Sequence, residues 1–146
     1  MNWYIKKFEE LTTNELYEIL KERTNVFVVE QNCPYPEVDG KDIAAHHVFL
    51  EKNGEIIAYS RVLPAGVAYK EVSFGRVLVK KEHRGTGLAK ELLEKVLHFL
   101  ETELKETTIK IQAQDYLQQF YGSFGFEAIS DVYLEDNIPH INMLKK

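Results

Sequence analysis

Hydrophobic residues recur every four positions from Leu88 to Leu104, in the clearest periodic pattern of the chain. Leucine or valine occupies positions 88, 92, 96, 100 and 104, and Leu93 and Leu97 widen the stripe. This spacing places apolar side chains on one face of a helix. The pattern therefore predicts an amphipathic helix over residues 88–104.

Apolar β-branched and aromatic runs elsewhere in the chain predict strands. These runs cover residues 3–8, 47–51, 55–63, 72–79, 107–113, 128–134 and 140–144. The dipeptide Asn53-Gly54 is typical of a tight hairpin turn, and Gly75 indicates a bulge or a close backbone approach inside its strand. Because the long helix connects the strands at 72–79 and 107–113, we expect those two strands to pair in parallel.

A helix is also predicted near the N-terminus, with charged residues in unusual places. Thr12 and Glu15 have the spacing of a capping box. The helix that follows is expected to bury Leu16, Ile19, Leu20 and Phe27. Arg23 and Glu30 lie on the same stripe, where a charge is costly unless it is paired or lines a cleft. Two interpretations remain open: the helix borders a cavity near its C-terminal half, or residues 26–29 end it early and leave Glu30 exposed.

Residues 31–45 are predicted to form a loop, because the two prolines at positions 34 and 36 cannot continue a helix. The loop carries three carboxylates, Glu37, Asp39 and Asp42. Such a cluster is either a solvated surface or an attraction for a cationic amine.

With a short helix at residues 116–123, the elements predict an α+β fold in which helices pack on a mixed sheet. A chain of 146 residues fits a single domain over residues 1–146. The net charge of −5 argues against a nucleic-acid partner, and no apolar run is long enough to predict a membrane span. Cys33 is the only cysteine, which is typical of a reducing, cytoplasmic setting.

A glycine-rich segment joins the strand at 72–79 to the long helix. Its backbone N–H groups lie where a helix begins, so they lack intrahelical partners and favour an anion. Leu88 after Gly87 excludes a Walker loop, and Lys90 stands where a dinucleotide fingerprint needs a third glycine. Arg84, Gly87 and Ala89 instead match the pattern Arg/Gln-x-x-Gly-x-Gly/Ala.

This loop, between a strand and an amphipathic helix, resembles the acetyl-CoA pyrophosphate loop of the GNAT N-acetyltransferases. The order of elements and the sequence Tyr-Gly-Ser-Phe-Gly-Phe at residues 121–126 extend the resemblance over the whole chain. Finer matches are similar to the ElaA-like branch of that family. They are Arg23 with residues 26–31, Pro34-Tyr35-Pro36-Glu37-Val38-Asp39, Phe74-Gly75-Arg76-Val77 and Ile138-Pro139-His140-Ile141.

The resemblance implies a GNAT fold in which the strands before and after the loop splay apart around the pantetheine arm of acetyl-CoA. By this resemblance, the pantetheine and the acetyl carbonyl would meet the backbone of Val77, Leu78 and Val79. The pyrophosphate would be held by Arg84, Gly85, Thr86, Gly87, Leu88 and Ala89. Acetyl-CoA is the cosubstrate so implied, and the acceptor is a small-molecule or peptide amine.

Amine acetylation needs a neutral nucleophile, a donor to the developing oxyanion and a proton for the leaving thiolate. The amide of Leu78 or Val79 is the expected oxyanion donor. Tyr121 is the expected general acid, because its position before the last Gly-Phe pair matches the family's usual tyrosine; the alternative is a core tyrosine. Glu30 is the expected base, because burial would raise the pKa of its carboxyl group.

The acceptor site is expected to use Arg23, His47 and His140. His46, His47 and His140 are also rivals to Glu30 as the base, and Arg23 either clamps a substrate carboxylate or pairs with Glu30. No metal site is predicted, since one cysteine and two adjacent histidines lack ligand spacing. A non-catalytic CoA-binding sensor of the same fold is the alternative function, and a homodimer is possible.

Overall fold

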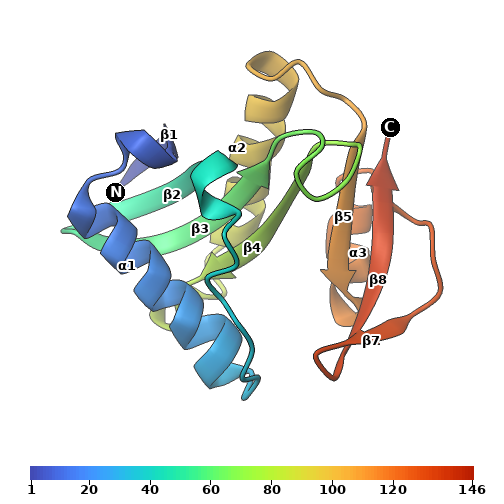
Figure 1. Ribbon diagram of the computed structural model, residues 1–146, viewed down its shortest axis with the longest axis horizontal. Coiled ribbons are helices and arrows are strands. Elements are labelled where there is room, and N and C mark those ends of the chain that lie inside the picture. Colours follow the sequence, from blue (N-terminus) through green and yellow to red (C-terminus); the bar gives the residue numbers. More distant parts are fainter.

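Two antiparallel sheets meet along one edge in the computed structural model, which describes residues 1–146 (Figure 1). The first sheet has the order β1 (Asn2–Lys7), β2 (His46–Lys52), β3 (Glu55–Leu63) and β4 (Ser73–Val79). The second contains β5 (Ile109–Gln114), β8 (Ile138–Lys145) and β6 (Glu127–Ala128), and β7 (Tyr133–Glu135) also pairs with β8. All of these ladders are antiparallel.

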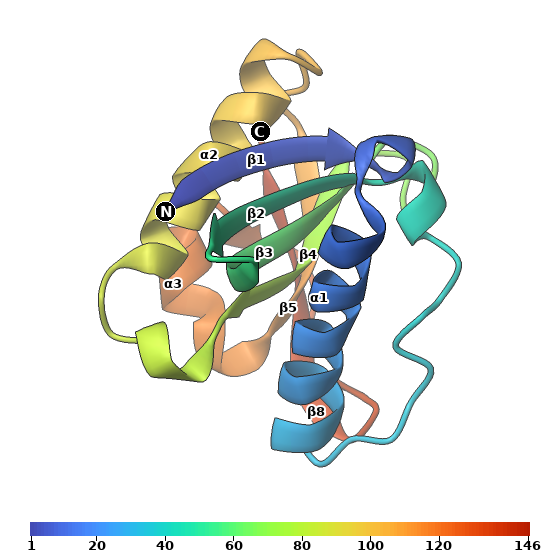
Figure 2. The same cartoon turned by 90° about the vertical axis from the view of Figure 1, so that its left-hand side faces the viewer.

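Helices cover both faces of the first sheet. Helix α1 (Thr13–Arg23) lies on one face and α2 (Leu88–Thr102) on the other, as the two perpendicular views show (Figures 1 and 2). The apolar stripe of α2 is buried as predicted, at Leu92, Leu93, Val96 and Leu100. The short helix α3 (Gln118–Gly122) follows β5. None of the helices is long and apolar enough to cross a membrane.

The parallel pairing predicted between β4 and β5 is reduced to a single bridge. Val72 and Ile109 form that bridge, and the amide of Lys110 donates to the carbonyl of Val72 at 3.1 Å. Beyond it the two strands diverge, so one edge of β4 has no strand partner. This divergence departs from the continuous parallel pairing expected of a βαβ unit, and it agrees with the splayed strands that the family resemblance implies.

The single strand predicted at 128–134 is wrong, because residues 129–132 leave the sheet. The Ser130 hydroxyl accepts a hydrogen bond from the amide of Asn142 at 3.0 Å, which takes one ladder position of β8. The apolar residues Ile129 and Val132 are exposed. The chain rejoins β8 only at Tyr133.

Helix α1 begins at the predicted capping box but buries a different face. Thr12 Oγ1 accepts from the amide of Glu15 at 3.0 Å, and the carboxylate of Glu15 accepts from the amide of Thr12 at 2.8 Å. The buried residues of the helix are Glu15, Ile19, Glu22 and Arg23, whereas Leu16, Leu20 and Phe27 are only half-buried. The chain then continues as a π-helical turn, η2 (Thr24–Glu30), so residues 26–29 widen the helix rather than end it.

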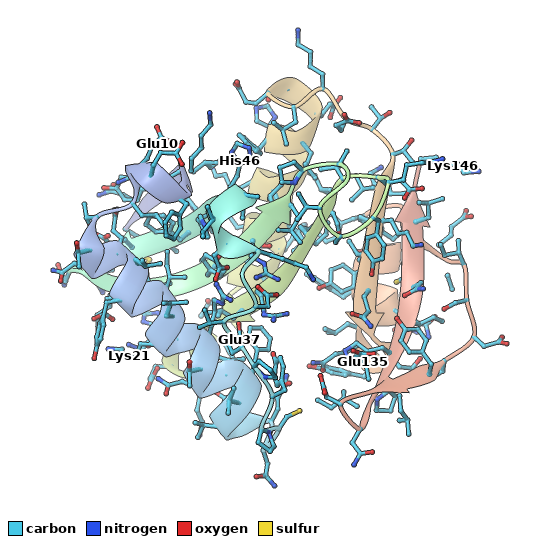
Figure 3. The ribbon with its side chains drawn as sticks, in the orientation of Figure 1. Glu10, Lys21, Glu37, His46, Glu135 and Lys146 are labelled. Carbon is cyan, nitrogen blue, oxygen red and sulfur yellow. The ribbon has the colours of Figure 1, made fainter.

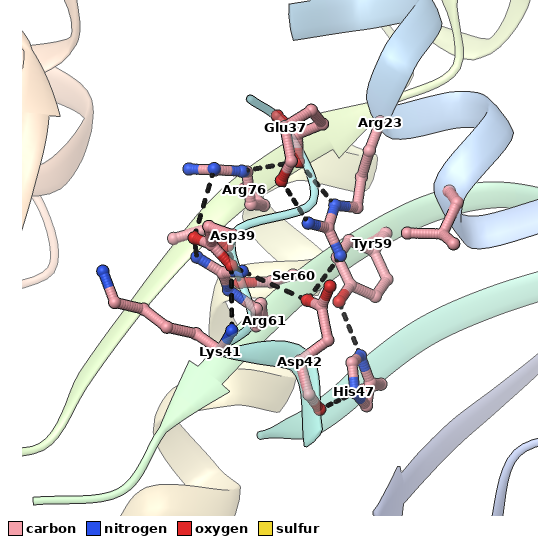
Figure 4. A network of polar contacts seen from close by, with 12 residues as sticks. Arg23, Glu37, Asp39, Lys41, Asp42, His47, Tyr59, Ser60, Arg61 and Arg76 are labelled. Carbon is pink, nitrogen blue, oxygen red and sulfur yellow. Dashed lines mark hydrogen bonds and ion pairs between the residues drawn. The ribbon is translucent and has the colours of Figure 1, made fainter. Parts of the chain in front are cut away.

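Arg23 is fully buried because the loop 31–45 folds over it and supplies carboxylates (Figure 4). Its Nε donates to Glu37 at 2.7 Å, and its Nη1 donates to Asp42 at 2.6 Å. Its Nη2 donates to the backbone carbonyl of Glu37 at 3.1 Å. A buried charge needs this degree of compensation. The acidic cluster of the loop is therefore an internal ion-pair network that fixes the loop to α1, and not a solvated surface.

The same network fixes the loop to β3 and β4. Arg61 holds both carboxylate oxygens of Asp39, at 2.8 and 2.9 Å. Arg76 donates to Glu37 at 2.7 Å. Burial alone would raise the pKa of Asp39, but the hydrogen bonds from Arg61 lower it to about 2.

Acid should weaken the fold through Asp39. Its folded-state pKa lies near 2, and an unfolded aspartate titrates near ~3.9. The stabilisation is therefore complete above about pH 4 and is lost as the pH falls towards 2, by roughly 1 kcal/mol after allowance for solvent exposure. We expect Asp39→Asn to lower the free energy of unfolding at pH 7, with a difference from wild type that shrinks between pH 4 and 2 in urea titrations.

Asp131→Asn is the matched control, because Asp131 is exposed and its side chain has no ion pair. It should leave the free energy of unfolding unchanged at every pH. A deficit in Asp39→Asn that stays constant from pH 7 to 2 would contradict the role given to the ionised carboxylate.

Candidate active site

A cleft of about 580 Å³ lies where β4 and β5 diverge. One wall comes from β4, the η2 turn and the loop 31–45, and the other from β5, α3 and the turn between β7 and β8. Figure 3 labels Glu37 on the side of the first sheet and Glu135 on the side of the second. The cleft-lining residues used below are Glu30, Asp39, Lys41, Arg61, Arg76, Val77, Leu78, Val79, Arg84, Tyr121, Glu135, Asp136 and His140.

The backbone of β4 offers hydrogen-bonding groups to the cleft at every second residue. The amide of Lys80 donates to Ile57 on β3 at 2.8 Å, and Leu78 lies opposite Tyr59 in the same register. Because peptide groups in an antiparallel pair alternate between the two sides, Leu78 directs its groups to β3. Val77 and Val79 direct theirs to the free edge. Of the two alternatives expected as oxyanion donor, the amide of Leu78 is therefore directed to β3, and the amides of Val77 and Val79 face the cleft.

A bulge in β4 breaks the ladder beside the cleft. The register shifts by one residue between Tyr59 and Arg61, opposite Arg76 and Val77. Arg76 has a φ of 50°, an uncommon conformation for a residue with a side chain. The Ser60 hydroxyl donates to the carbonyl of Gly75 at 3.0 Å and so holds the bulge. The bulge that Gly75 indicated is therefore present, but the left-handed residue is its neighbour.

The start of α2 presents a row of unpaired amides. Gly85 and Gly87 have φ values of 79° and 82°, which glycine adopts without strain. Helix α2 has no side-chain cap, and the amides of residues 85–90 donate to no protein acceptor. The loop is exposed and lies at the end of the cleft marked by Arg84, beyond the cleft lining itself. These donors fit an anionic group such as a diphosphate.

Arg84 is the point where the cleft meets this loop. Its Nε donates to the carbonyl of Val79 at 2.9 Å, and its Nη2 donates to Glu30 at 2.9 Å. The side chain of Glu30 is about one third exposed. The burial that was expected to make Glu30 a base is therefore absent, and its carboxylate is occupied by an ion pair. Glu30 is better described as a partner of Arg84.

Tyr121 lines the cleft with its ring packed among aromatic residues. The ring lies 6.2 Å from Phe74 and 6.2 Å from Phe126, centroid to centroid. The residue as a whole is 6% exposed. Its hydroxyl oxygen nevertheless remains accessible and has no hydrogen-bond partner in the protein. Burial raises the pKa of Tyr121 above its usual range, so the phenol is protonated at neutral pH. Tyr121 is thus both a core residue and an available donor at the cleft wall.

Two residues expected at the acceptor site lie away from the cleft. Arg23 is enclosed by its carboxylate partners, as described above. His47 is also fully buried: its Nε2 donates to the carbonyl of Asp42 at 3.0 Å and its Nδ1 accepts from Tyr59 at 2.6 Å. Burial lowers the pKa of His47. The expectation that Arg23 and His47 contact substrate does not fit this geometry, because both side chains are fully buried and neither lines the cleft.

His140 is the one of the three candidate histidines that lines the cleft. Its Nδ1 lies 2.7 Å from the carbonyl of Ile138. A carbonyl only accepts, so Nδ1 carries the proton and Nε2 of the neutral ring keeps a lone pair. His46 instead packs against Phe99. The candidate for a base therefore moves from Glu30 to His140.

Several cleft residues were missed because the sequence carries only a weak signal for them. Arg61 lies in a buried strand of apolar residues, where an arginine is uncommon and indicates a paired charge. Lys41 and Glu135 lie in loop and turn segments whose position over the cleft depends on the tertiary fold. No group of three or more His, Cys, Asp or Glu side chains converges as in a metal site.

Comparisons with known proteins agree with this geometry. The Acetyltransferase (GNAT) domain family matches residues 9–146. The chain is 38% identical to protein ElaA of Escherichia coli K12 over all of this chain and 97% of that protein. It is 41% identical to a UPF0039 protein of Schizosaccharomyces pombe over 98% of this chain and 95% of the other. An acyl-CoA N-acyltransferase from Pseudomonas aeruginosa superimposes with a TM-score of 0.95 at 42% identity, over the full length of both chains.

The same fold is found in the crystal structure of Escherichia coli ElaA, with a TM-score of 0.94. The GNAT fold and the ElaA-like resemblance expected from the sequence are thereby confirmed. The splayed strands, the uncapped start of α2 and these full-length matches lead to one conclusion: the chain belongs to the GNAT acetyltransferase family and is an ElaA-like member of it.

Proposed function

We propose that this protein is an N-acetyltransferase that moves the acetyl group of acetyl-CoA to an amine in a ternary complex. The observation that carries the proposal is the arrangement of donors along one cleft. Unpaired helix-start amides lie at one end, and the free edge of β4 and the unpartnered hydroxyl of Tyr121 line the interior. Acetyl-CoA presents its diphosphate, its amide-rich pantetheine arm and its thioester one after the other, and each of these groups needs hydrogen-bond donors at the matching place in the cleft.

The fit to acetyl-CoA is tested by the space around the loop. A Cβ added at Gly85 or Gly87 would meet no atom within 4 Å, so these glycines are not required for packing inside the protein. Their positive φ angles direct the following amides outward. We assign the pyrophosphate to residues 84–89 and the pantetheine arm to the backbone of Val77 and Val79.

The residues of this chain supply three functions to the transfer. The outward amide of Val77, which lies farther from the loop 84–89 than that of Val79, donates to the acetyl carbonyl as negative charge develops on its oxygen. The amine nitrogen forms a bond to the acetyl carbon, and the carbon–sulfur bond breaks. Tyr121 gives its proton to the sulfur, and the amine loses one proton to Nε2 of His140, directly or through water. Exchange of these protons with solvent restores both side chains.

A non-catalytic CoA sensor is the alternative, and a thiol-release assay over a panel of amines separates the two. A sensor needs the loop 84–89 but no proton donor at Tyr121. We expect release of free thiol from acetyl-CoA only when an acceptor amine is present. Binding of acetyl-CoA without turnover on any amine would refute the enzymatic proposal.

Removing the hydroxyl of Tyr121 should slow the transfer without weakening the cofactor. We expect Tyr121→Phe to lower kcat by about 10²-fold, the low end for general acid catalysis, because the phenylalanine keeps the aromatic packing. The Kd for acetyl-CoA, measured by calorimetry, should stay within about twofold. Tyr17→Phe is the control, since Tyr17 is exposed on α1. Unchanged turnover in Tyr121→Phe would remove this residue from the mechanism.

The pH dependence of kcat should have a rising limb alone across the neutral and mildly alkaline range. The amine becomes nucleophilic as it loses its proton, so the rate rises with pH. The raised pKa of Tyr121 keeps the general acid protonated beyond the usual ~10 of a tyrosine. A descending limb of kcat centred below about pH 9 that disappears in Tyr121→Phe would show that Tyr121 loses its proton there, and would contradict the raised pKa.

A negative charge placed at Gly87 should prevent binding of the diphosphate. Asparagine and aspartate both tolerate a positive φ and differ little in size. We expect Gly87→Asp to weaken acetyl-CoA binding by at least about 10²-fold, whereas Gly87→Asn retains most of the affinity. Both variants place a side chain at the same positive φ, so their melting temperatures should be alike and the comparison isolates the charge. Equal affinities of the two variants would place the diphosphate elsewhere.

A further inference from the structure

Arg61 has two hydrogen-bond donors that nothing in the protein uses. A guanidinium carries five N–H groups. Nη1 donates to Asp39 at 2.8 Å and to Asp42 at 3.1 Å, and Nη2 donates to Asp39 at 2.9 Å. The remaining donors are the Nε–H and the second hydrogen of Nη2. Nε of Arg61 is the single fully enclosed side-chain nitrogen or oxygen in the chain that lacks a partner.

These two donors lie parallel on one side of the guanidinium. Asp39 occupies the end formed by Nη1 and Nη2, so the side formed by Nε and Nη2 is the one that lacks a partner. That fork matches the two oxygens of a carboxylate. An enclosed donor without a partner is destabilising, because it has lost its hydration and gained no acceptor. Arg61 is 4% exposed and belongs to the cleft lining, so a ligand in the cleft is the natural source of the missing acceptor.

The charges around Arg61 favour an anion at this point. The three arginines of the ion-pair network are balanced by its three carboxylates, at positions 37, 39 and 42. Lys41 is exposed, lines the same part of the cleft and forms no ion pair. Figure 4 shows the backbone of Lys41 beside Asp39, with its side chain extending away from Arg61. The wall therefore presents one uncompensated positive charge in addition to the unpartnered donors of Arg61.

The opposite wall has the complementary sign. Glu135 and Asp136, at the turn between β7 and β8, line the cleft and form no ion pair. They attract a cationic amine, and His140 on the same side has a free Nε2. A molecule that carries an ammonium and a carboxylate meets both walls, whereas a simple amine leaves the fork of Arg61 empty.

We propose that the acceptor is a small amine that also carries a carboxylate, of the α-amino acid type, and that its carboxylate is bound by the side fork of Arg61 together with Lys41. The inference rests on the proposed transferase function and specifies its substrate class. The substrate carboxylate that Arg23 was expected to clamp is thereby assigned to a different arginine of the same network, one that reaches the cleft.

Matched pairs of acceptors test this assignment. Phenylalanine and 2-phenylethylamine, leucine and 3-methylbutylamine, and lysine and cadaverine each differ by the carboxylate. Thiol release from acetyl-CoA gives kcat/KM for every member, and mass spectrometry identifies the N-acetyl product. For each pair, kcat/KM of the amino acid is divided by kcat/KM of the matching amine. This ratio is then compared between wild type and a variant, so that differences in the intrinsic reactivity of the two amines cancel.

We expect wild type to favour the carboxylate member of at least one pair by at least about 30-fold. Arg61→Lys keeps a charge for Asp39 but removes the fork, and should abolish most of that preference. Lys41→Gln changes an exposed side chain and should reduce the preference about 3- to 5-fold, without loss of folding. Lys52→Gln, an exposed lysine at the far end of β2, is the control and should leave it unchanged. Arg61→Lys removes part of a buried network, so its melting temperature is measured as well. If Arg61→Lys fails to fold, the result for Lys41→Gln decides the question.

The outcomes separate this inference from the function on which it rests. Turnover of amines with no advantage for a carboxylate would overturn the inference and leave the transferase standing. A strong preference that survives in Lys41→Gln, and in a folded Arg61→Lys, would place the carboxylate at another site. Acetyl-CoA binding without turnover of any amine in the panel would overturn both proposals together.

Discussion

The divergence of β4 from β5 is the constraint on which the rest of the structure depends. A single parallel bridge at Val72 and Ile109 joins the two sheets, and beyond it the backbone of β4 has an edge without a strand partner. In a closed sheet these peptide groups would be used by a neighbouring strand. Here they face a cleft instead, and the groups that close the cleft come from loops and from side chains far apart in the sequence.

The buried ion-pair network keeps this open arrangement rigid. It joins α1, the loop 31–45, β3 and β4 through arginines that each contact more than one carboxylate. Such a network adds little net stability compared with an apolar core, but breaking one partner leaves a buried charge uncompensated. Its effect is therefore to define a single position for the loop, and with it the shape of one cleft wall.

Much of the framework could be predicted from local sequence. The strand Glu55–Leu63 and the capping box at Thr12 were predicted from turn and cap chemistry, and α2 from its apolar period. Those signals act over a few residues, where the physical cause and the sequence pattern coincide. The uncapped, glycine-rich start of α2 was visible for the same reason, since glycine at positive φ is a local requirement.

The parts that could not be predicted depend on contacts across the fold. Arg23 was placed on a substrate-facing stripe, yet its partners are 14 and 19 residues away in a loop whose path the sequence does not fix. The sequence left open whether the Glu30 carboxylate borders a cavity or is exposed, and Arg84, 54 residues further along, meets it at the surface. Residues 129–132 lie in a run that was predicted to be one strand, and they leave the ladder because one serine hydroxyl replaces a backbone partner.

The missing side-chain cap on α2 also links ligand occupancy to the integrity of the helix. Without a capping residue at Gly87, the first turn of α2 relies on water to satisfy its amides. Any anion that settles there supplies the absent cap, so the helix start becomes more ordered as the ligand concentration rises. Amide hydrogens of residues 88–90 should thus report occupancy directly, through slower exchange with solvent, even where no distant part of the molecule moves.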